Sequence, residues 1–424
     1  MRVFNLIWAG QGVSLIGSAM TTFGIGVWVF LDTGSPTYFA TLILAASLPA
    51  LLVLPVAGAL VDRWDRRRVM LLSDTGAALA PAGVVLLHTT GALQLWHIYL
   101  LVGLGAIFKA FQWPAFSALV PQLVAKDDLG KANGRVSLIE AAGQVFGALL
   151  GGGLYALVGL RGLLVIDLLT LAAALGTLLY SFRWLPTEPR HPSTDHTPVS
   201  HRDELLEGWR FIRQRPGLLG LLLFFAANNL VMEMAIVLVP PLVLSTHTPA
   251  DLGIVNAIGW TGMTIVSLLI STTRGPQRLI RAILTVATCH AALVLAMGLE
   301  QSVWMLAAGM FGILGGYAVT NAATSTLWQL KTPQDKQGRV FAIRRMVAWS
   351  AEPLAYGLAG PVAQLFGTPL AQHLGLGQGG GIAVVFLLAG PALLLVITAT
   401  YLRPRVRHVE RELPDAVALP VPQT

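Results

Sequence analysis

The chain has 424 residues, of which 55% are hydrophobic and only 12% charged, and its mean hydropathy is +0.69. Soluble domains carry about twice that share of charged residues. This composition excludes a soluble globular protein and places most of the chain in lipid.

Twelve apolar runs follow one another along the chain, each long enough to cross a hydrocarbon layer of roughly 30 Å. Backbone polar groups cannot stay unpaired in lipid, and the alternation of barrel strands is absent, so we expect these runs to be helices. The predicted fold is therefore an all-α membrane protein with twelve transmembrane helices. The approximate ranges are 4–31, 38–61, 68–88, 94–120, 137–159, 161–183, 217–244, 252–271, 279–299, 301–328, 339–366 and 380–402.

A charged loop joins the second and third runs and reads Gly58-Ala-Leu-Val-Asp62-Arg63-Trp-Asp65-Arg66-Arg67-Arg68. Basic residues alone could serve only to fix the orientation of the loop at the membrane surface. The spacing of Gly58, Asp62 and Arg63 is more specific than orientation requires.

Ionisable residues lie at membrane depth within the apolar runs, where a charge near the bilayer centre costs about 2.5 to 3.5 kcal/mol. Glu233 and Glu352 are the deepest, and because a carboxylate shielded from water binds protons more readily, we predict that they contact protons or substrate. Lys109 is a further candidate for this contact. The alternative is a static ion pair between helices that involves Lys109 or an arginine. Glu140 and Asp167 lie closer to helix ends, where we expect an interfacial location.

Polar residues in other runs are candidates for the lining of a substrate cavity, among them Gln11, Asn228 and Asn229. The fifth run has a different feature, four glycines spaced so that most share one helix face. Such a face lets a neighbouring backbone approach closely, and plain helix packing is the simplest interpretation. These glycines are Gly143, Gly147, Gly151 and Gly152.

A polar, proline-rich segment after residue 183 divides the chain into two halves. We predict an N-terminal bundle at 1–183, a cytoplasmic linker with an amphipathic helix at 184–216, a C-terminal bundle at 217–402 and a cytoplasmic tail at 403–424. The triplet Gly134-Arg135-Val136 opens the fifth run and recurs as Gly338-Arg339-Val340 at the eleventh. Motifs at equivalent places in two halves are typical of a transporter built from parallel repeats.

The net charge of +7 does not indicate nucleic-acid binding, because the basic residues follow the topology. Loops after odd-numbered runs contain a single arginine or lysine, Arg161, whereas loops after even-numbered runs are rich in these basic residues. By the positive-inside rule, this asymmetry places both termini and the linker in the cytoplasm. The basic residues of the even-numbered loops outside the linker are Arg63, Arg66, Arg67, Arg68, Lys126, Lys131, Arg135, Arg274, Arg278, Lys331, Lys336 and Arg339.

The charged loop resembles the loop 2–3 motif of the major facilitator superfamily, G-x-L-a-D-R-x-G-R-R-x-x-L/M, with Asp65 at the position of the second glycine. The glycines of the fifth run resemble the antiporter motif G-x-x-x-G-P-x-x-G-G-x-L, with Ala148 in place of proline. Gly10-Gln11-x-x-Ser14, Asn228-Asn229 and Val239-Pro240-Pro241 add a similarity to the enterobactin-exporter and macrolide-efflux branch.

The resemblance implies two pseudo-symmetric six-helix bundles and a cytoplasmic latch, in which Gly58, Asp62, Arg63, Arg66 and Arg67 face the eleventh run near Arg344. It also implies proton-coupled efflux of small amphipathic molecules, such as drugs, macrolide-like compounds or siderophores, across a bacterial inner membrane. A nutrient symporter and a non-transporting receptor or scaffold remain alternatives. Substrate, coupling ion and oligomeric state stay open, with a monomer as the simplest expectation.

Enzyme and cofactor motifs are absent from the sequence. The segment at Gly130-Lys131 lacks both the first glycine and the Ser or Thr of a phosphate-binding loop. No H-E-x-x-H motif occurs, and the single cysteine, Cys289, excludes a cysteine-based metal cluster. We therefore expect neither an enzyme nor a resident metal or cofactor.

Overall fold

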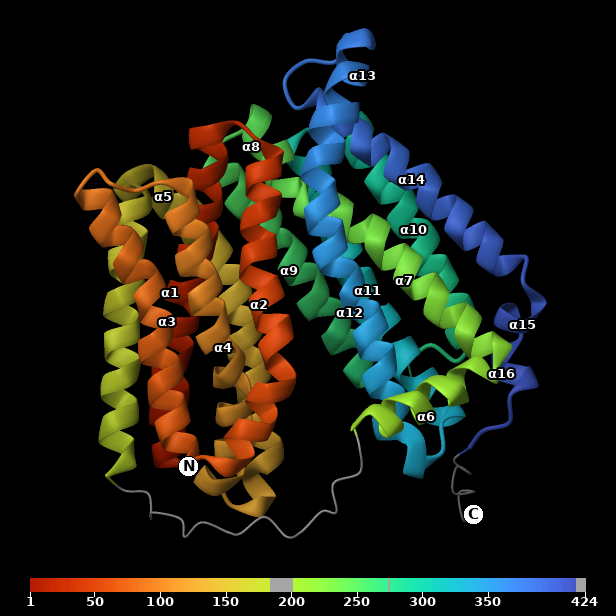
Figure 1. The fold of residues 1–424 in the computed structure, drawn as a ribbon, viewed down its shortest axis with the longest axis horizontal. Coiled ribbons are helices and arrows are strands. Elements are labelled where there is room, and N and C mark those ends of the chain that lie inside the picture. Colours follow the sequence, from red (N-terminus) through yellow and green to blue (C-terminus); the bar gives the residue numbers. More distant parts are fainter. Residues whose placement is uncertain (184–200, 274, 417–424) are drawn as a thin grey trace. The chain divides into compact units, whose positions relative to one another are not determined.

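A computed structural model of the chain describes residues 1–183, 201–273 and 275–416, without the side chains at 2, 55, 58, 59, 62, 63, 66, 118 and 201–205. All regular secondary structure in these ranges is helical (Figure 1). Contacts divide the chain into two compact units. Unit 1 comprises Met1–Ser193 and Pro240–Ile258, and unit 2 comprises Thr194–Val239 and Gly259–Thr424.

The elements up to residue 182 are α1 (Arg2–Thr33), α2 (Pro36–Arg63), α3 (Arg66–Thr89), α4 (Leu95–Leu123), a 3-10 turn η1 (Lys126–Asp128) and α5 (Leu129–Phe182). The next are α6 (His201–Arg213), α7 (Pro216–Val237), α8 (Val239–Thr246), α9 (Pro249–Thr272), α10 (Leu279–Leu299) and α11 (Val303–Lys331). The last are η2 (Gln334–Lys336), α12 (Gln337–Val362), a π-helical turn η3 (Ala363–Gly367), α13 (Thr368–His373), α14 (Gly380–Tyr401), α15 (Pro404–Arg407) and α16 (Val409–Glu412).

Ten segments of the described chain are long and apolar enough to cross a membrane, which confirms the prediction of a helical membrane protein. One of them is α5, whose two arms are joined at Gly159 and can be followed in Figure 1 from gold to yellow-green. Gly159 has a φ of +63°, a left-handed conformation that glycine adopts without the steric cost of a Cβ atom. The bend therefore occurs where the sequence predicts the boundary between the fifth and sixth runs.

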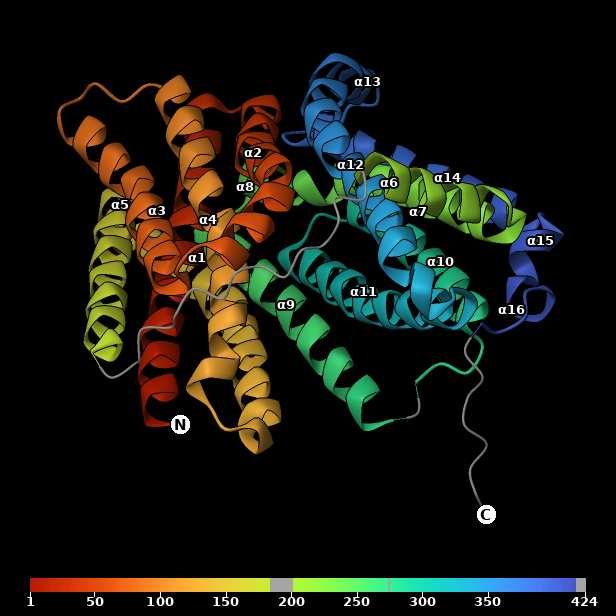
Figure 2. The same cartoon turned by 60° about the horizontal axis from the view of Figure 1, so that its bottom comes forward.

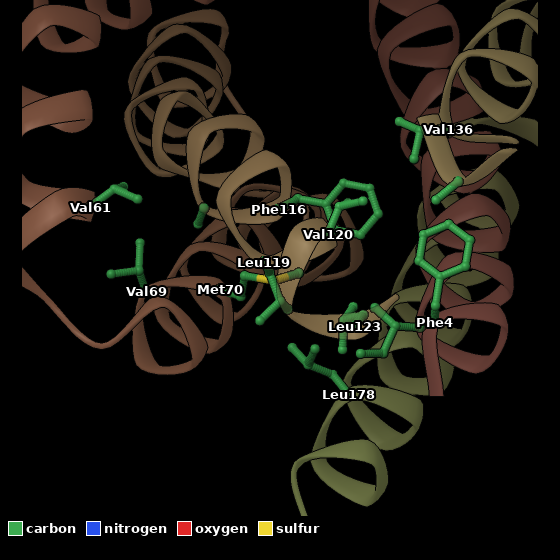
Figure 3. Close-up of a cluster of buried hydrophobic side chains, with 13 residues drawn as sticks. Phe4, Val61, Val69, Met70, Phe116, Leu119, Val120, Leu123, Val136 and Leu178 are labelled. Atoms are coloured by element: carbon green, nitrogen blue, oxygen red, sulfur yellow. The ribbon is translucent and has the colours of Figure 1, made fainter. Parts of the chain in front are cut away.

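Unit 1 is built on α5, which packs along α1 and α3, and on α4, which packs against α2 and α3. Buried side chains from these helices form a hydrophobic cluster that includes Phe4, Met70, Leu119 and Leu178 (Figure 3). In lipid, helices associate through close packing, because the surrounding acyl chains are as apolar as the side chains. This cluster thus joins α1, α3, α4 and the second arm of α5.

Unit 2 is held together by α7 against α12 and α14, and by α10 against α11 and α14 (Figure 2). Small residues permit these contacts. A Cβ atom on Gly262 of α9 would lie 2.5 Å from the Phe311 carbonyl oxygen, and one on Gly390 of α14 would lie 3.0 Å from that of Ala291. Glycine at these crossings therefore brings backbones together, as is common between membrane helices.

The predicted amphipathic helix of the linker corresponds to α6, which lies against α12. Glu207 of α6 forms an ion pair with Lys336 at 3.4 Å and a second with Arg339. Leu206 and Trp209 are exposed. Exposed apolar groups on a helix with charged neighbours are typical of a helix at a membrane surface.

The tail beyond α14 returns to the ends of three helices of unit 2. The Nζ atom of Lys331, at the end of α11, donates to the carbonyl oxygens of Glu410 at 2.7 Å and Leu413 at 2.5 Å. It also pairs with the carboxylate of Asp415 at 2.8 Å. The Glu410 carboxylate accepts a hydrogen bond from the backbone N–H of Ile280, at the start of α10. Residues 404–416 thus form a strap across this end of the unit, and α15 packs on α7.

Candidate functional site

A cavity of about 1050 Å³ lies within unit 2. This volume matches the upper range of ligand-binding cavities in proteins. Residues from α7, α9, α10, α11 and α12 line it and combine aromatic rings, amides and both signs of charge. The side chains used below are Asn228, Asn229, Glu233, His290, Tyr317, Thr324, Trp328, Phe341, Arg344, Arg345, Trp349, Glu352 and Tyr356.

Glu233 of α7 occupies the point where three helices meet in this cavity. Its Oε1 atom lies 3.4 Å from the hydroxyl of Tyr317 on α11, and its Oε2 atom lies 3.4 Å from that of Tyr356 on α12. These distances are long for O–H···O bonds, so each contact is weak. Glu352 of α12 is close enough for charge repulsion with Glu233. Among the described residues, neither carboxylate forms an ion pair with a basic group.

Several buried polar atoms of the cavity residues have no hydrogen-bond partner in the described part of the chain. They are Asn228 Oδ1, His290 Nε2, Thr324 Oγ1 and Trp328 Nε1. A buried polar atom without a partner costs about 1 to 3 kcal/mol, unless a ligand or water satisfies it. The ring of His290 also lies edge-on to Tyr317, with 5.4 Å between the centroids. The cavity therefore offers hydrogen-bonding groups that a polar ligand can engage.

Two arginines of α12 rest on aromatic rings of the same cavity. The guanidinium carbon of Arg344 lies 5.9 Å from the Trp328 ring centroid and 5.8 Å from that of Phe341. That of Arg345 lies 4.8 Å from the Trp349 centroid. Cation–π contacts of this kind hold a guanidinium group in place and contribute about 0.5 to 2 kcal/mol each. The cavity thus presents both fixed positive charge and carboxylates to a ligand.

The charged loop between α2 and α3 is described only in part. Gly58, Asp62 and Arg63 belong to the end of α2 and Arg66 opens α3, but the side chains of all four lie outside the described residues. Asp65 caps α3, since its carboxylate accepts from the backbone N–H of Arg67 at 2.9 Å. This role accounts for an aspartate where the family motif has glycine, because aspartate is among the most favoured N-cap residues.

The two latch residues with described side chains lie in different units. The Arg67 guanidinium lies 5.6 Å from the ring centroid of Phe182, within unit 1. Arg344 lines the cavity of unit 2. The latch itself remains a prediction.

Gln11 belongs to a buried cluster in unit 1. Asp74 of α3 has 0% of its surface exposed, and its Oδ2 atom accepts from Gln11 Nε2 at 2.9 Å while its Oδ1 atom accepts from Gln112 Nε2 at 2.7 Å. Gln112 Nε2 also lies 3.3 Å from Gln11 Oε1. The three side chains come from α1, α3 and α4 and form one hydrogen-bonded ring. Gln11 is therefore a neighbour of a buried acid.

Lys109 of α4 is exposed, and it forms no ion pair within 4.0 Å among the described residues. Asp167 is 3% exposed within unit 1 and accepts a hydrogen bond from Ser18 at 3.2 Å. The second arm of α5 packs on α1, which covers this carboxylate, and its depth in the membrane stays a prediction. The charges of Lys109 and Asp167 attract each other across a longer distance.

The glycines of the fifth run lie in the first arm of α5, at two crossings. Gly143, Gly147 and Gly151 face α1, where Cβ atoms on Gly143 and Gly151 would lie 2.8 Å from Leu15 and 3.0 Å from Phe23. Gly152 faces α9 instead. A Cβ atom there would lie 2.7 Å from the carbonyl oxygen of Pro249, so this crossing has no room for a side chain.

Sequence reasoning missed four polar residues that the structure places in these clusters: Asp74, His290, Tyr317 and Tyr356. Each is a polar or ionisable residue inside an apolar run, which is the signal that identified Glu233. Asp74 follows shortly after the arginines of the charged loop, so the sequence does not distinguish it from the charges of that loop. The tyrosines gave a weaker signal, because tyrosine at a membrane helix is most often an interfacial anchor.

Comparison with known proteins gives the family. A profile of the Major Facilitator Superfamily matches residues 7–356. Macrolide efflux protein A of Streptococcus pyogenes is 26% identical over 414 residues, covering 96% of both chains. The multidrug efflux pump Tap of Mycolicibacterium fortuitum is 25% identical over 418 residues, covering 95% of this chain and 94% of that one.

Solved structures share the fold at lower identity. A nucleoside transporter matches with a TM-score of 0.74 at 11% identity, covering 94% of this chain and 99% of its own. A bacterial homologue of the lysosomal transporter Spinster matches with a TM-score of 0.68 at 16% identity, covering 99% and 98%. Together with the family profile, these matches show that the chain is an integral membrane transport protein of the Major Facilitator Superfamily, similar to its efflux members.

Proposed function

We propose that this chain is a proton-coupled exporter of small amphipathic molecules. The observation that carries the proposal is Glu233, a carboxylate without a basic partner among the described residues, held between Tyr317 and Tyr356 in a ligand-sized cavity. A carboxylate in that setting can exchange a proton for a ligand, because either one relieves the cost of an unpaired charge away from water. Glu352 shares the cavity and is the second carrier.

The lining of the cavity supports an amphipathic substrate. Trp328, Phe341 and Trp349 offer aromatic surface, while Asn228 and His290 offer polar atoms that have no hydrogen-bond partner among the described residues. The similarity to macrolide and multidrug efflux proteins supports export over uptake. Macrolide-like compounds, other drugs and siderophores are the substrate classes that we propose.

A twelve-helix architecture follows if the two arms of α5 each cross the membrane and α12 crosses as well. The bend at Gly159 supports the first condition. For the second, α12 is 26 residues long, and its arginines and Glu352 explain why it does not stand out as apolar. We infer two six-helix bundles at 1–183 and 217–402, with both termini, the linker and the tail in the cytoplasm of a bacterium.

Transport would proceed by alternating access of these two bundles. We propose that Asp62 and the arginines Arg63, Arg66 and Arg67 form a cytoplasmic latch toward α12 near Arg344, closed in one state and open in the other. The spacing from Gly58 through Arg67 supports this role, and Asp65 supplies the helix cap that starts α3. Lys109 and Asn229 complete the set of candidate contacts for substrate or protons.

Everted membrane vesicles from a bacterium without its own efflux pumps test the proposal. Uptake of ethidium and of labelled erythromycin is measured with an inward-acidic pH gradient, with and without a protonophore. Gradient-dependent uptake of at least one probe supports export, and its loss in Glu233→Gln and Glu352→Gln supports the assigned carriers. Uptake in right-side-out vesicles alone would favour a nutrient symporter. Binding of a partner protein without any transport would favour a receptor or scaffold.

A further inference from the structure

The ring of Asp74, Gln11 and Gln112 belongs to unit 1, whereas the cavity that carries the proposed exchange belongs to unit 2. We propose that Asp74 is a second proton-binding site, and that the Gln112 amide adjusts to its protonation. This inference rests on the proposed proton coupling and adds a site to it.

The first argument is the surroundings of Asp74. It is fully buried on α3, and the hydrogen bonds that it accepts from described side chains come from the neutral amides of Gln11 and Gln112. The charged residues of the neighbouring helices are Lys109 on α4, Lys131, Arg135, Glu140, Arg161 and Asp167 on α5, and Arg2 and Asp32 on α1. Among the described side chains, none of these forms an ion pair with Asp74. An ionised carboxylate without a positive partner is costly in such a place, and binding a proton removes the charge.

The second argument is the geometry of the ring. With Asp74 ionised, both amide nitrogens point at its oxygens, and Gln112 Nε2 is shared between Asp74 and Gln11 Oε1. An amide carries a donor and an acceptor at almost the same positions, so half a turn of its terminal torsion exchanges them. After such a turn, Gln112 presents its Oε1 atom to Asp74 Oδ1.

This rearrangement keeps both amides bonded to a protonated acid. The new O–H bond on Asp74 Oδ1 donates to Gln112 Oε1, Gln11 Nε2 still donates to Asp74 Oδ2, and the bond between Gln112 and Gln11 is lost. The change needs only rotation of one amide group, so α1, α3 and α4 keep their contact. Gln11 and Gln112 are each half-buried, which places them between the acid and the surface. A proton taken from solution can therefore be accommodated with both oxygens of Asp74 still hydrogen-bonded.

The ring would also tie protonation to helix position. In both forms its hydrogen bonds connect α1, α3 and α4, but the bonds to an ionised acid are stronger than those to a neutral one. Proton binding thus loosens the junction of the three helices. This is a property that a transporter with moving helices can use.

Infrared difference spectroscopy of the purified protein in lipid tests the site directly. The protein carries Glu233→Gln and Glu352→Gln, so that the carriers assigned above are silent, and spectra are collected across the physiological pH range. We expect a protonated-carboxyl band that titrates with pH, shifts in deuterated water and disappears with Asp74→Asn. The matched control is Ser73→Ala, at the neighbouring buried residue whose hydroxyl donates to the Val69 carbonyl oxygen, and it should keep the band. If the titrating band is the same with and without Asp74→Asn, the proposal is overturned.

Transport in proteoliposomes gives the second measurement, in the background with both glutamates intact. Asp74→Asn keeps the shape of the protonated acid, so we expect substrate counterflow to continue while accumulation driven by the pH gradient falls roughly tenfold. Unchanged accumulation with an unchanged number of protons per substrate would overturn the role of Asp74. If the unmodified protein itself shows no gradient-driven transport, the proposed function fails, and the infrared titration still decides whether Asp74 binds a proton.

Discussion

Gly152 of α5 and Gly253 of α9 lie backbone against backbone: a Cβ atom on Gly152 would be 2.9 Å from the Cα atom of Gly253. The reverse also holds, since a Cβ atom on Gly253 would lie 2.7 Å from the Ala148 carbonyl oxygen. Backbone atoms cannot rotate away as a flexible side chain can. This crossing therefore depends on two glycines facing each other.

We predict that Gly152→Ala slows transport because it disturbs this contact between α5 and α9. The added methyl group forces the helices apart at a cost of about 1 to 3 kcal/mol. This cost corresponds to roughly a 5- to 150-fold change in the equilibrium between the conformational states of the transport cycle. Transport rates in vesicles check this, normalised to the amount of folded protein. Gly153→Ala is the control, because a Cβ atom there meets nothing within 4 Å. Equal rates for the two variants would show that the close crossing has no part in transport.

A second prediction concerns Asn228, which is 6% exposed and whose Oδ1 atom is without a partner among the described residues. If this atom serves substrate binding, Asn228→Ala should weaken affinity about tenfold and leave the ligand-free protein as stable as before or more stable. Equilibrium binding and thermal unfolding together check the two parts. Thr326→Ala, on α11 and outside the cavity lining, should change neither. A loss of stability with unchanged affinity would assign Asn228 to packing instead.

The strap at residues 404–416 leads to a third prediction. Lys331 has a side chain that is 4% exposed and satisfies two carbonyl oxygens and the Asp415 carboxylate. Lys331→Met should lower the stability of unit 2 by about 1 to 3 kcal/mol and make the strap accessible to protease. Lys336→Met removes a partly exposed ion pair with Glu207, for which at most about 1 kcal/mol is expected. Similar effects of both changes would mean that the strap is not held by Lys331.

The membrane character, the helical fold and most helix limits follow from the sequence. Long apolar runs without strand-like alternation can pair their backbone polar groups in lipid only as helices. The break between the fifth and sixth runs could also be predicted, since Gly159 and Arg161 interrupt the apolar residues where α5 bends. The assignment of buried polar residues was less complete. Glu233 is the one charged residue of its run and Glu352 the one acid of its run, so both could be identified. The burial of Asp167 depends on which helix faces it.

The pairing of residues from distant helices could not be predicted. Nothing in the order of residues indicates that Gln11 and Gln112 converge on Asp74, or that Tyr317 and Tyr356 converge on Glu233. Such meetings are set by helix rotation and tilt, which depend on packing against neighbouring helices. Spacing on one helix fixes which residues share its face, and it does not fix which helix that face meets.

The central claim is that Glu233 and Glu352 exchange protons for substrate, and proton release on binding tests it most directly. Purified protein in weakly buffered solution is mixed with a probe that the vesicle experiment has shown to be transported, and the pH change is followed. We predict that the unmodified protein releases protons as the probe binds, and that the variant with Glu233→Gln and Glu352→Gln binds the probe with a much smaller release. Equal release by both proteins at equal occupancy would contradict the account.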